Sequence, residues 1–272
     1  MIIKVLAIGD IVGQESVSFV KKHLRKLKTD TGASLVIANA ENAAPGNGLD
    51  PQSAGVLFSC GVDVITSGNH IWHRREIKTY LDDEPCVLRP ANYPPVCPGS
   101  GHVVVEADGV RFLVMNALGN VYIDPPLACP FVTVEKILEH MAGKYDISIL
   151  DFHAEATSEK IALARYFDGR VGSGHLSAVF GTHTHVQTAD ETILPNGCGY
   201  ITDLGMTGPR DSVLGIRTGC VLDKFRFKMP VKFEVAEGNI ELHGAVFSFD
   251  TDTAKAVSVE RIRYDGKNEN DK

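Results

Sequence analysis

The sequence predicts an α/β fold built on one mixed sheet or on two packed sheets. Short apolar β-type runs alternate with helix-like stretches in the first half of the chain, and hairpin-like pairs of runs follow later. A chain of 272 residues can also bury a sizeable core without staples. Because no repeat, low-complexity segment or linker interrupts the pattern, we predict a single domain over residues 1–265 and a disordered polar tail over 266–272.

The first half of the chain alternates strands and helices. Strands are predicted over 4–8, 34–40 and 62–66, and helices over 15–28, 52–59 and 73–81. The helix over 15–28 has its apolar residues at helical spacing on one face, with Lys and Arg on the other. Asp50 and Pro51 are typical of a helix start, because Asp is a favoured N-cap and Pro suits the first helical position.

The second half contains hairpin signals as well. Runs over 103–106 and 111–115 flank Asp108-Gly109, a turn dipeptide that favours a β-hairpin. Helices are predicted over 131–141 and from 157 to near 167, with strands over 147–151, 178–181 and 200–202. From residue 216 onward we expect β structure, with a turn at 237–239 between runs over 231–235 and 240–247.

Charge and cysteine usage exclude several classes of protein. The formal net charge of −7 argues against a broad basic surface for duplex nucleic acid or for an anionic membrane. A small phosphate-bearing substrate remains possible, since bound metal ions supply positive charge locally. The apolar run over 2–8 is too short to cross a membrane and leads directly into Gly9-Asp10, so we do not expect it to be a secretory leader. The six cysteines lack C-x-x-C and zinc-finger spacing, so we expect reduced thiols in a cytoplasmic protein.

Residues of metal-ligand type follow five of the predicted strands, at the point where each strand ends. They are Asp10, Glu41 with Asn42, Asn69 with His70, His153, and His183 with His185. A single Asp after a strand is usually a turn residue, and a single His usually lies on the surface or in the core. In open α/β sheets, however, ligands bind outside the carboxyl ends of the strands. Five coincidences at this position indicate one shared site.

The chemistry of this set favours catalytic metal ions. It combines carboxylate, amide and imidazole donors and contains no thiolate, which suits Mn, Fe or Zn in a catalytic role. Eight candidates are too many for one tetrahedral ion. They suit two ions bridged by a carboxylate, an arrangement that generates a hydroxide nucleophile for displacement at phosphorus. A nearby histidine would then protonate the leaving oxygen.

Six sequence blocks resemble the calcineurin-like metallophosphoesterases and, within them, the bacterial YmdB-type subfamily. The blocks are GDIVG (9–13), AEN (40–42), SGNHIW (67–72), DFHAEATSEK (151–160), GTHTHVQTAD (181–190) and TDLGMTGP (202–209). The resemblance extends from residue 1 to about residue 250. It implies a four-layer αββα sandwich of two mixed sheets flanked by helices, with the metals at the strand ends.

The resemblance also implies a role for each candidate residue. One metal would be held by Asp10, Glu41, Asn42 and His185, and the other by Glu41, Asn69, His153 and His183. Glu41 would bridge the two, and His70 would be the general acid. The chain departs from the wider superfamily at Val12, where a histidine is common, and at Glu41, where an aspartate is common. Asn42 is expected to replace the missing histidine.

The subfamily implies a metal-dependent phosphodiesterase that acts on 2′,3′-cyclic nucleotides and related phosphodiesters. It further implies two divalent or trivalent metal ions per chain, with Fe or Mn favoured and Zn possible, and a homo-oligomer. The residues themselves leave the details open. Trp72, Tyr93 and Tyr122 are either stacking residues for a base or packing and surface residues. The loop 205–208 is either a phosphate loop or a tight turn, and Arg210 is a weaker candidate for an anionic substrate.

Two other functions are compatible with parts of this pattern. A different binuclear hydrolase, such as an amide hydrolase, shares the carboxylate and His-x-His chemistry. The Gly-Asn-His block favours phosphate esters, because a neutral amide ligand beside a separate acid suits their cleavage. A non-catalytic or weakly catalytic regulator on the same fold would be indicated by missing ligands, but all of the candidate ligands are present.

Overall fold

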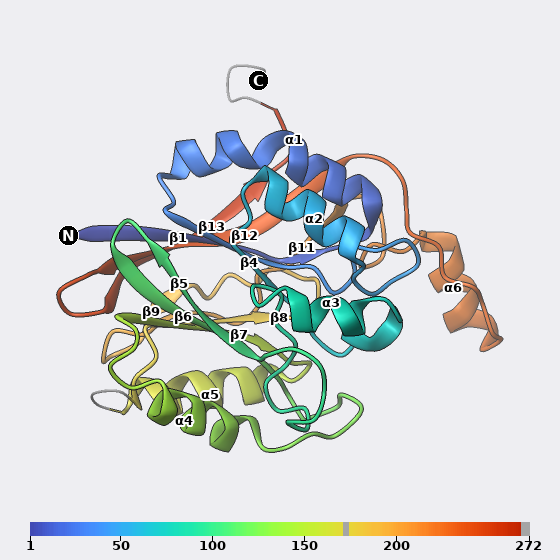
Figure 1. Ribbon diagram of the computed structural model, residues 1–272. Helices are drawn as coiled ribbons and strands as arrows, with labels where there is room; N and C mark the ends of the chain where they lie inside the picture. Colours follow the sequence, from blue (N-terminus) through green and yellow to red (C-terminus); the bar gives the residue numbers. More distant parts are fainter. Residues whose placement is uncertain (171–173, 268–272) are drawn as a thin grey trace.

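Two β-sheets stack face to face in the computed structural model, which describes residues 1–170 and 174–267 (Figure 1). The first sheet has the order β2-β11-β12-β1-β3-β4, and β13 pairs with β12. The bounds are Ile2–Ile8 for β1, Asp10–Ile11 for β2, Leu35–Asn39 for β3, Val64–Thr66 for β4, Met206–Pro209 for β11, Ile240–Asp250 for β12 and Lys255–Tyr264 for β13. Since β1 runs parallel to β3 and antiparallel to β12, the sheet is mixed.

The second sheet has the order β5-β6-β7-β8-β10-β9. Its strands are His102–Ala107 for β5, Val110–Leu118 for β6, Ile147–His153 for β7, Ala178–Thr182 for β8, Thr192–Ile193 for β9 and Gly199–Ile201 for β10. The predicted hairpin is confirmed as β5 and β6, and Asp108 and Gly109 both have left-handed φ angles in its turn. The parallel strands β6, β7 and β8 all direct their carboxyl ends toward one edge.

Helices cover the outer face of each sheet, which confirms the four-layer αββα sandwich. Helices α1 (Gly13–Thr31) and α2 (Pro51–Cys60) lie on the first sheet, and α4 (Pro130–His140) and α5 (Thr157–Asp168) lie on the second (Figure 1). A separate apolar core fills the space between the two sheets. Helix α1 buries the predicted face, and Asp50 caps α2 by accepting a hydrogen bond from the Ser53 N–H at 2.7 Å.

The structure corrects two of the predicted elements. Continuous β structure from residue 216 is wrong, because residues Thr218–Phe227 form helix α6 and residues 231–235 contribute only an isolated bridge. Helix α6 buries little against the rest of the chain, so neither a core nor a sheet decides its conformation. The helix predicted over 73–81 is divided into a 3₁₀ turn, Ile71–His73, and helix α3, Ile77–Asp83.

Other expectations on organisation have different outcomes. The six cysteines are free thiols, as predicted. None of the helices in the described part of the chain combines the length and the apolar character needed to cross a bilayer. The single domain over 1–265 stays a prediction. Of the tail predicted to be disordered, residues 268–272 lie outside the described residues.

Candidate metal centre

The carboxyl ends of strands from both sheets meet at one edge of the sandwich. Strands β1, β3 and β4 of the first sheet lead into Asp10, Glu41 and Asn69. Strands β7 and β8 of the second sheet lead into His153 and His183. The structure brings all eight predicted residues into one chain of contacts, because parallel strands deliver their carboxyl ends to the same edge.

The inner part of the centre is built around Glu41, His153 and His183, whose ligand atoms all lie within 4.8 Å of one another. The Nε2 atom of His153 is 3.2 Å from Glu41 Oε1 and 3.2 Å from Asn69 Oδ1. It is also 3.1 Å from His183 Nδ1, so two imidazole nitrogens face each other. Donor atoms that converge in this way match the ligand types of a transition-metal ion.

Gly68 makes this convergence possible. A Cβ atom at Gly68 would lie 2.2 Å from His153 Cδ2 and 2.4 Å from Glu41 Oε2, well inside contact distance. Any side chain at this position would therefore displace both residues. This requirement explains the glycine immediately before Asn69 and His70 in the sequence.

The outer part of the centre is built around Asp10, Asn42 and His185. Asn42 Nδ2 is 3.3 Å from His185 Nε2, which in turn lies 3.7 Å from Asp10 Oδ1. Asp10 is fully buried, and its Oδ2 accepts a hydrogen bond from the His183 N–H at 3.1 Å. Its Oδ1 has no hydrogen-bond partner among the residues that the structure describes. A buried carboxylate oxygen without a donor is costly unless a cation binds it, so the site fits a metal ion.

His70 lies at the rim, between the two parts. Its Nδ1 is 2.8 Å from Asn42 Oδ1 and 3.1 Å from Glu41 Oε1, and its backbone N–H donates to Glu41 Oε2 at 2.9 Å. The side chain is 27% exposed, whereas that of His153 is fully buried. His70 is thus held in place on one side of its ring while the ring still meets solvent.

The two histidines of the His-x-His loop have left-handed backbones, with φ of 99° at His183 and 63° at His185. Such conformations cost roughly 1–3 kcal/mol each outside glycine and persist only where the surroundings enforce them. The carbonyl of Leu214 accepts a hydrogen bond from His185 Nδ1 at 3.1 Å, which leaves Nε2 to face Asp10. The strain therefore aims both rings into the centre.

A buried ion pair supports this loop from behind. Lys160 Nζ donates to the carbonyl of Thr182 and to Asp203 Oδ2, both at 2.8 Å. Asp203 Oδ2 also accepts from the N–H of Thr184 at 3.1 Å. Lys160 and Asp203 are both fully buried. Both residues lie in the sequence blocks that carry the family resemblance. Their pairing could not be predicted from the sequence, because 43 residues separate them.

A second support fixes the tautomer of His153. Thr182 Oγ1 donates to Asp151 Oδ1 at 2.6 Å and is 2.9 Å from His153 Nδ1. Since the hydroxyl proton is used on Asp151, Nδ1 carries the proton that Thr182 accepts, and Nε2 is the nitrogen that a metal ion binds once it displaces the second proton. Asp151 Oδ2 is held by the Asn39 amide at 3.1 Å and by the Thr66 hydroxyl. The roles of these supporting residues were likewise not predicted from the sequence.

Burial and mutual contact shift the pKa values of the centre. Burial raises the pKa of Asp10. Burial also acts to raise the pKa of Glu41, but His153 and His70 hold that pKa well below its usual range. Burial acts to lower the pKa of His153, whereas Glu41 beside it raises this pKa to about 9. Burial and the neighbouring His153 lower the pKa of His183 to about 3.

The candidates for substrate binding have other structural surroundings than the metal centre. Trp72 and Tyr93 pack edge to face with their rings 5.4 Å apart, and Tyr122 is 88% exposed. Residues 206–208 belong to strand β11 and do not form a tight turn, and the carbonyl of Gly205 accepts from the Asp10 N–H at 3.1 Å. This segment therefore anchors Asp10 through backbone pairing. Arg210 follows β11 and is exposed.

The family model described as YmdB-like protein matches residues 6–262. The chain belongs to the YmdB-like family. This membership confirms the resemblance that the six blocks indicated, and it confirms the expectation that the chain is a hydrolytic enzyme.

Relatives of this YmdB-like chain are similar along nearly their whole length. It is 46% identical over 259 residues to the 2′,3′-cyclic-nucleotide 2′-phosphodiesterase of Bacillus subtilis strain 168, which covers 95% of this chain and 96% of that one. A hypothetical protein from Thermus thermophilus has a crystal structure with a TM-score of 0.88 and 39% identity, over 96% of this chain and 99% of that one. The crystal structure of a novel phosphatase from Mycoplasma pneumoniae gives a TM-score of 0.89 and 34% identity, over 97% and 94%.

Proposed function

We propose that this YmdB-like protein is a metal-dependent phosphodiesterase that hydrolyses 2′,3′-cyclic nucleotides and related phosphodiesters. The observation that carries the proposal is the convergence of carboxylate, amide and imidazole groups at one edge of the sandwich, beside Asp10 Oδ1, a buried oxygen without a hydrogen-bond donor among the described residues. The substrate class is supported by the cyclic-nucleotide phosphodiesterase of B. subtilis, which matches nearly the full chain.

We assign the two metal positions to the two parts of the centre. Glu41, Asn69, His153 and His183 would hold the inner ion, and Asp10, Glu41, Asn42 and His185 the outer one. Glu41 is the bridging residue in this assignment, because its Oε1 lies 3.2 Å from His153 Nε2 of the inner part and 3.1 Å from His70 Nδ1 at the rim between the two parts. The donor set contains nitrogen and oxygen but no thiolate, which favours Fe or Mn and permits Zn. When bound, such ions lower the pKa of water and offset the charge of the phosphoryl oxygens.

His70 is assigned as the general acid. Its Nδ1 is engaged by Asn42 and Glu41, so the proton for the leaving oxygen is carried by the other ring nitrogen, Nε2. Hydrolysis of a 2′,3′-cyclic phosphate at the P–O2′ bond expels an alkoxide, which is a poor leaving group without protonation. A positioned acid typically contributes about 10²–10⁴-fold to such a step.

The remaining expectations follow from the same proposal. A small phosphodiester or cyclic nucleotide is the partner, since the net charge of −7 disfavours duplex nucleic acid and anionic membranes. A cytoplasmic location is supported by the six free cysteines, because thiols stay reduced in that compartment.

The test is hydrolysis of 2′,3′-cyclic AMP by metal-free protein reconstituted separately with Mn, Fe(II), Zn and Mg. We expect turnover that depends on the metal and disappears in Glu41→Gln, whose metal content per chain also falls. His140→Ala is the matched control, because this histidine is exposed at the end of α4. Normal turnover in Glu41→Gln would contradict the site.

A second substrate separates the acid from the metal ligands. His70→Ala should lose far more activity on the cyclic nucleotide than on bis-p-nitrophenyl phosphate, whose leaving group needs no protonation. Equal losses on both substrates would contradict the role of His70. Cleavage of amide substrates in place of phosphodiesters would indicate the other hydrolase class. Full metal binding with no turnover on any substrate would indicate a regulatory protein.

A further inference from the structure

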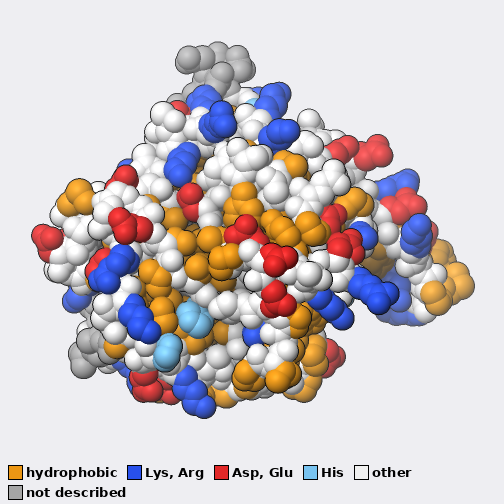
Figure 2. All heavy atoms as spheres, viewed as in Figure 1, with side chains coloured by type: hydrophobic (Ala, Val, Ile, Leu, Met, Phe, Trp, Pro, Cys, Tyr) orange, Lys and Arg blue, Asp and Glu red, His pale blue; other side chains and the backbone are white. Residues whose placement is uncertain are grey.

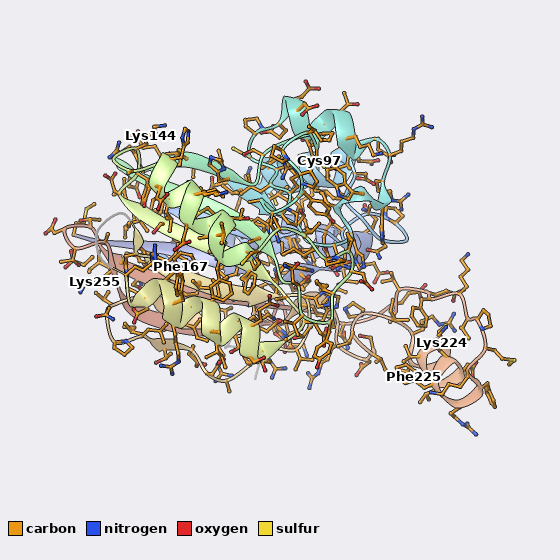
Figure 3. The ribbon with its side chains drawn as sticks, turned by 90° about the horizontal axis from the view of Figure 1, so that it is seen from below. Cys97, Lys144, Phe167, Lys224, Phe225 and Lys255 are labelled. Carbon is orange, nitrogen blue, oxygen red and sulfur yellow. The ribbon has the colours of Figure 1, made fainter. Side chains whose placement is uncertain are left out.

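A pocket lies beside the second sheet, at the start of β5. This side pocket has a volume of about 490 Å³ and is formed between helix α4 and the loop over residues 89–101. In Figure 3, Cys97 marks this loop, and Lys144 marks the chain just after α4. A cavity of this size is in the range of small-molecule binding sites.

The ionisable side chains that line the side pocket are basic. Arg89, His102 and Lys136 contribute to it, and no Asp or Glu is among its lining residues in the described part of the chain. Figure 2 shows histidine side chains beside Lys and Arg side chains on this part of the surface. The basic lining stands out in a chain whose net charge is −7. A concave surface of one charge attracts ions of the opposite charge.

Arg89 is buried in the wall of the side pocket, with only 5% of its surface exposed. Its Nε donates to the carbonyl of Pro98 and its Nη1 to that of Pro90, both at 3.0 Å, and its Nη2 donates to the carbonyl of Cys97 at 3.5 Å. Within the described residues, its hydrogen bonds therefore go to backbone carbonyls, and no carboxylate neutralises it. Since a guanidinium has five N–H donors, each Nη keeps one for a ligand.

Other arginines that are less buried do have carboxylate partners. Those that pair with Asp or Glu are Arg111, Arg170, Arg217, Arg261 and Arg263. Burial lowers the pKa of Arg89, because removal of a cation from water without a counter-ion disfavours its charged form. A buried charge without a partner is costly, so an anion in the side pocket would supply what the chain does not.

The side pocket is a neighbour of the metal centre. Asn92, which lines the pocket, accepts from the Leu118 N–H at 2.9 Å and donates to the Leu118 carbonyl at 2.8 Å. Leu118 ends β6 and pairs with His153 of β7. Because adjacent strands are about 4.8 Å apart, the pocket begins on the order of 10 Å from His153. Tyr93, another lining residue, packs against Trp72, two residues after His70.

We propose that the side pocket binds a phosphate group, as a second anion site beside the metal centre. The free N–H groups of Arg89 suit two oxygens of one phosphate, and Lys136 at the rim adds a point charge. This phosphate is either free inorganic phosphate or an upstream phosphate of an oligonucleotide whose cyclic end lies at the metals. The second source rests on the proposed function, whereas phosphate binding itself does not.

The test is calorimetric titration of the metal-loaded, full-length protein with inorganic phosphate. We expect the wild type to bind an additional phosphate whose affinity falls at least about tenfold in Lys136→Glu and in Arg89→Met. Lys22→Glu is the matched control, because it makes the same charge change at an exposed position of α1, on the other sheet. Lys136 is exposed as well, so its reversal should leave the fold intact even where Arg89→Met destabilises it. Circular dichroism melting checks each variant.

Kinetics then identify the source of the phosphate. A KM that is lower for a trinucleotide ending in a 2′,3′-cyclic phosphate than for 2′,3′-cyclic AMP, with the difference lost in Lys136→Glu, indicates an upstream phosphate of the substrate. Equal KM values, with the additional phosphate still bound, indicate free phosphate. A protein that binds this phosphate but hydrolyses neither substrate contradicts the proposed function and not the pocket. Phosphate binding by Lys136→Glu and Lys22→Glu with the same number and affinity as the wild type would overturn the proposal.

Discussion

The metal centre and residues 218–232, which contain helix α6 and which we call the arm, depart from ordinary burial in opposite ways. In the centre, carboxylates and imidazoles are buried, with Asp10 and His153 both fully inaccessible. In the arm, large apolar side chains such as Phe225 lie in solvent. Buried polar groups and exposed apolar patches are the two informative exceptions to the rule that polar groups face water. The buried polar groups of the centre fit a cation that the chain alone does not supply.

The two regions differ just as much in how they are held. The centre is fixed by hydrogen bonds that join the sheets, such as that from the Asn39 amide to Asp151. The arm has few internal supports, since α6 buries one side chain of its ten described residues. The centre should therefore be sensitive to single substitutions in its supports, whereas the exposed positions of the arm should tolerate them.

The largest expected effect is that of Lys160→Met. It leaves Asp203 buried and without its cation, which costs about 3–5 kcal/mol of the free energy of unfolding. Urea denaturation measures this loss. The matched control is Lys26→Met, whose pair with Asp30 is exposed to solvent and should contribute little to the free energy of unfolding. A loss at Lys160 as small as that of the control would contradict the supporting role of the buried pair.

The next effect is on metal affinity in Asp151→Asn. The new amide places a donor against either the Thr182 hydroxyl or the Asn39 amide, so the hydrogen bonds that orient His153 are weakened. Loss of such a supporting carboxylate typically reduces metal affinity about 10–100-fold. Titration of metal-free protein with Mn measures it. Asp168→Asn is the control, because Asp168 is buried but accepts from Cys198 N–H at 3.0 Å, away from the centre. Equal affinities in the two variants would contradict this role.

A smaller effect is the pH dependence of metal binding. In the metal-free protein, Glu41 raises the pKa of His153 to about 9, so a metal ion must displace a proton at neutral pH. The apparent affinity should rise about tenfold per pH unit below that pKa and level off above it. His183, with a pKa of about 3, is already neutral and adds no slope. Competition with a chelator between about pH 6 and pH 8 measures the slope. A flat profile would show that His153 is not the proton donor.

The smallest effect is that of Phe225→Ser on turnover. This ring is 64% exposed and lies on the outer arm, so its removal should change kcat by less than about twofold. Steady-state kinetics on 2′,3′-cyclic AMP would measure it. A large fall in kcat would show that the arm and the centre are coupled, which would end the contrast between them.

The sequence allowed the candidate ligands to be identified because the order of strands and polar residues is a local property. Each apolar run ends at a residue such as Asp10 or His153, and parallel strands carry these residues to one edge. The prediction failed at residues 218–227, where we expected β structure and the chain forms helix α6. Helix α6 buries one side chain, so its sequence is not constrained by packing against a core. The spacing of its apolar residues therefore does not distinguish a helix from a strand.

The sequence by itself determined the alternation of elements, the strand-end residues and the family blocks that carry the resemblance. Only the tertiary structure decided which groups support the strand-end residues. The pairing of Lys160 with Asp203 and the link from Asp151 through Thr182 to His153 join distant segments, which no local period encodes. The exposure of the arm was likewise decided in three dimensions, because burial depends on what packs against a residue and not on its type alone.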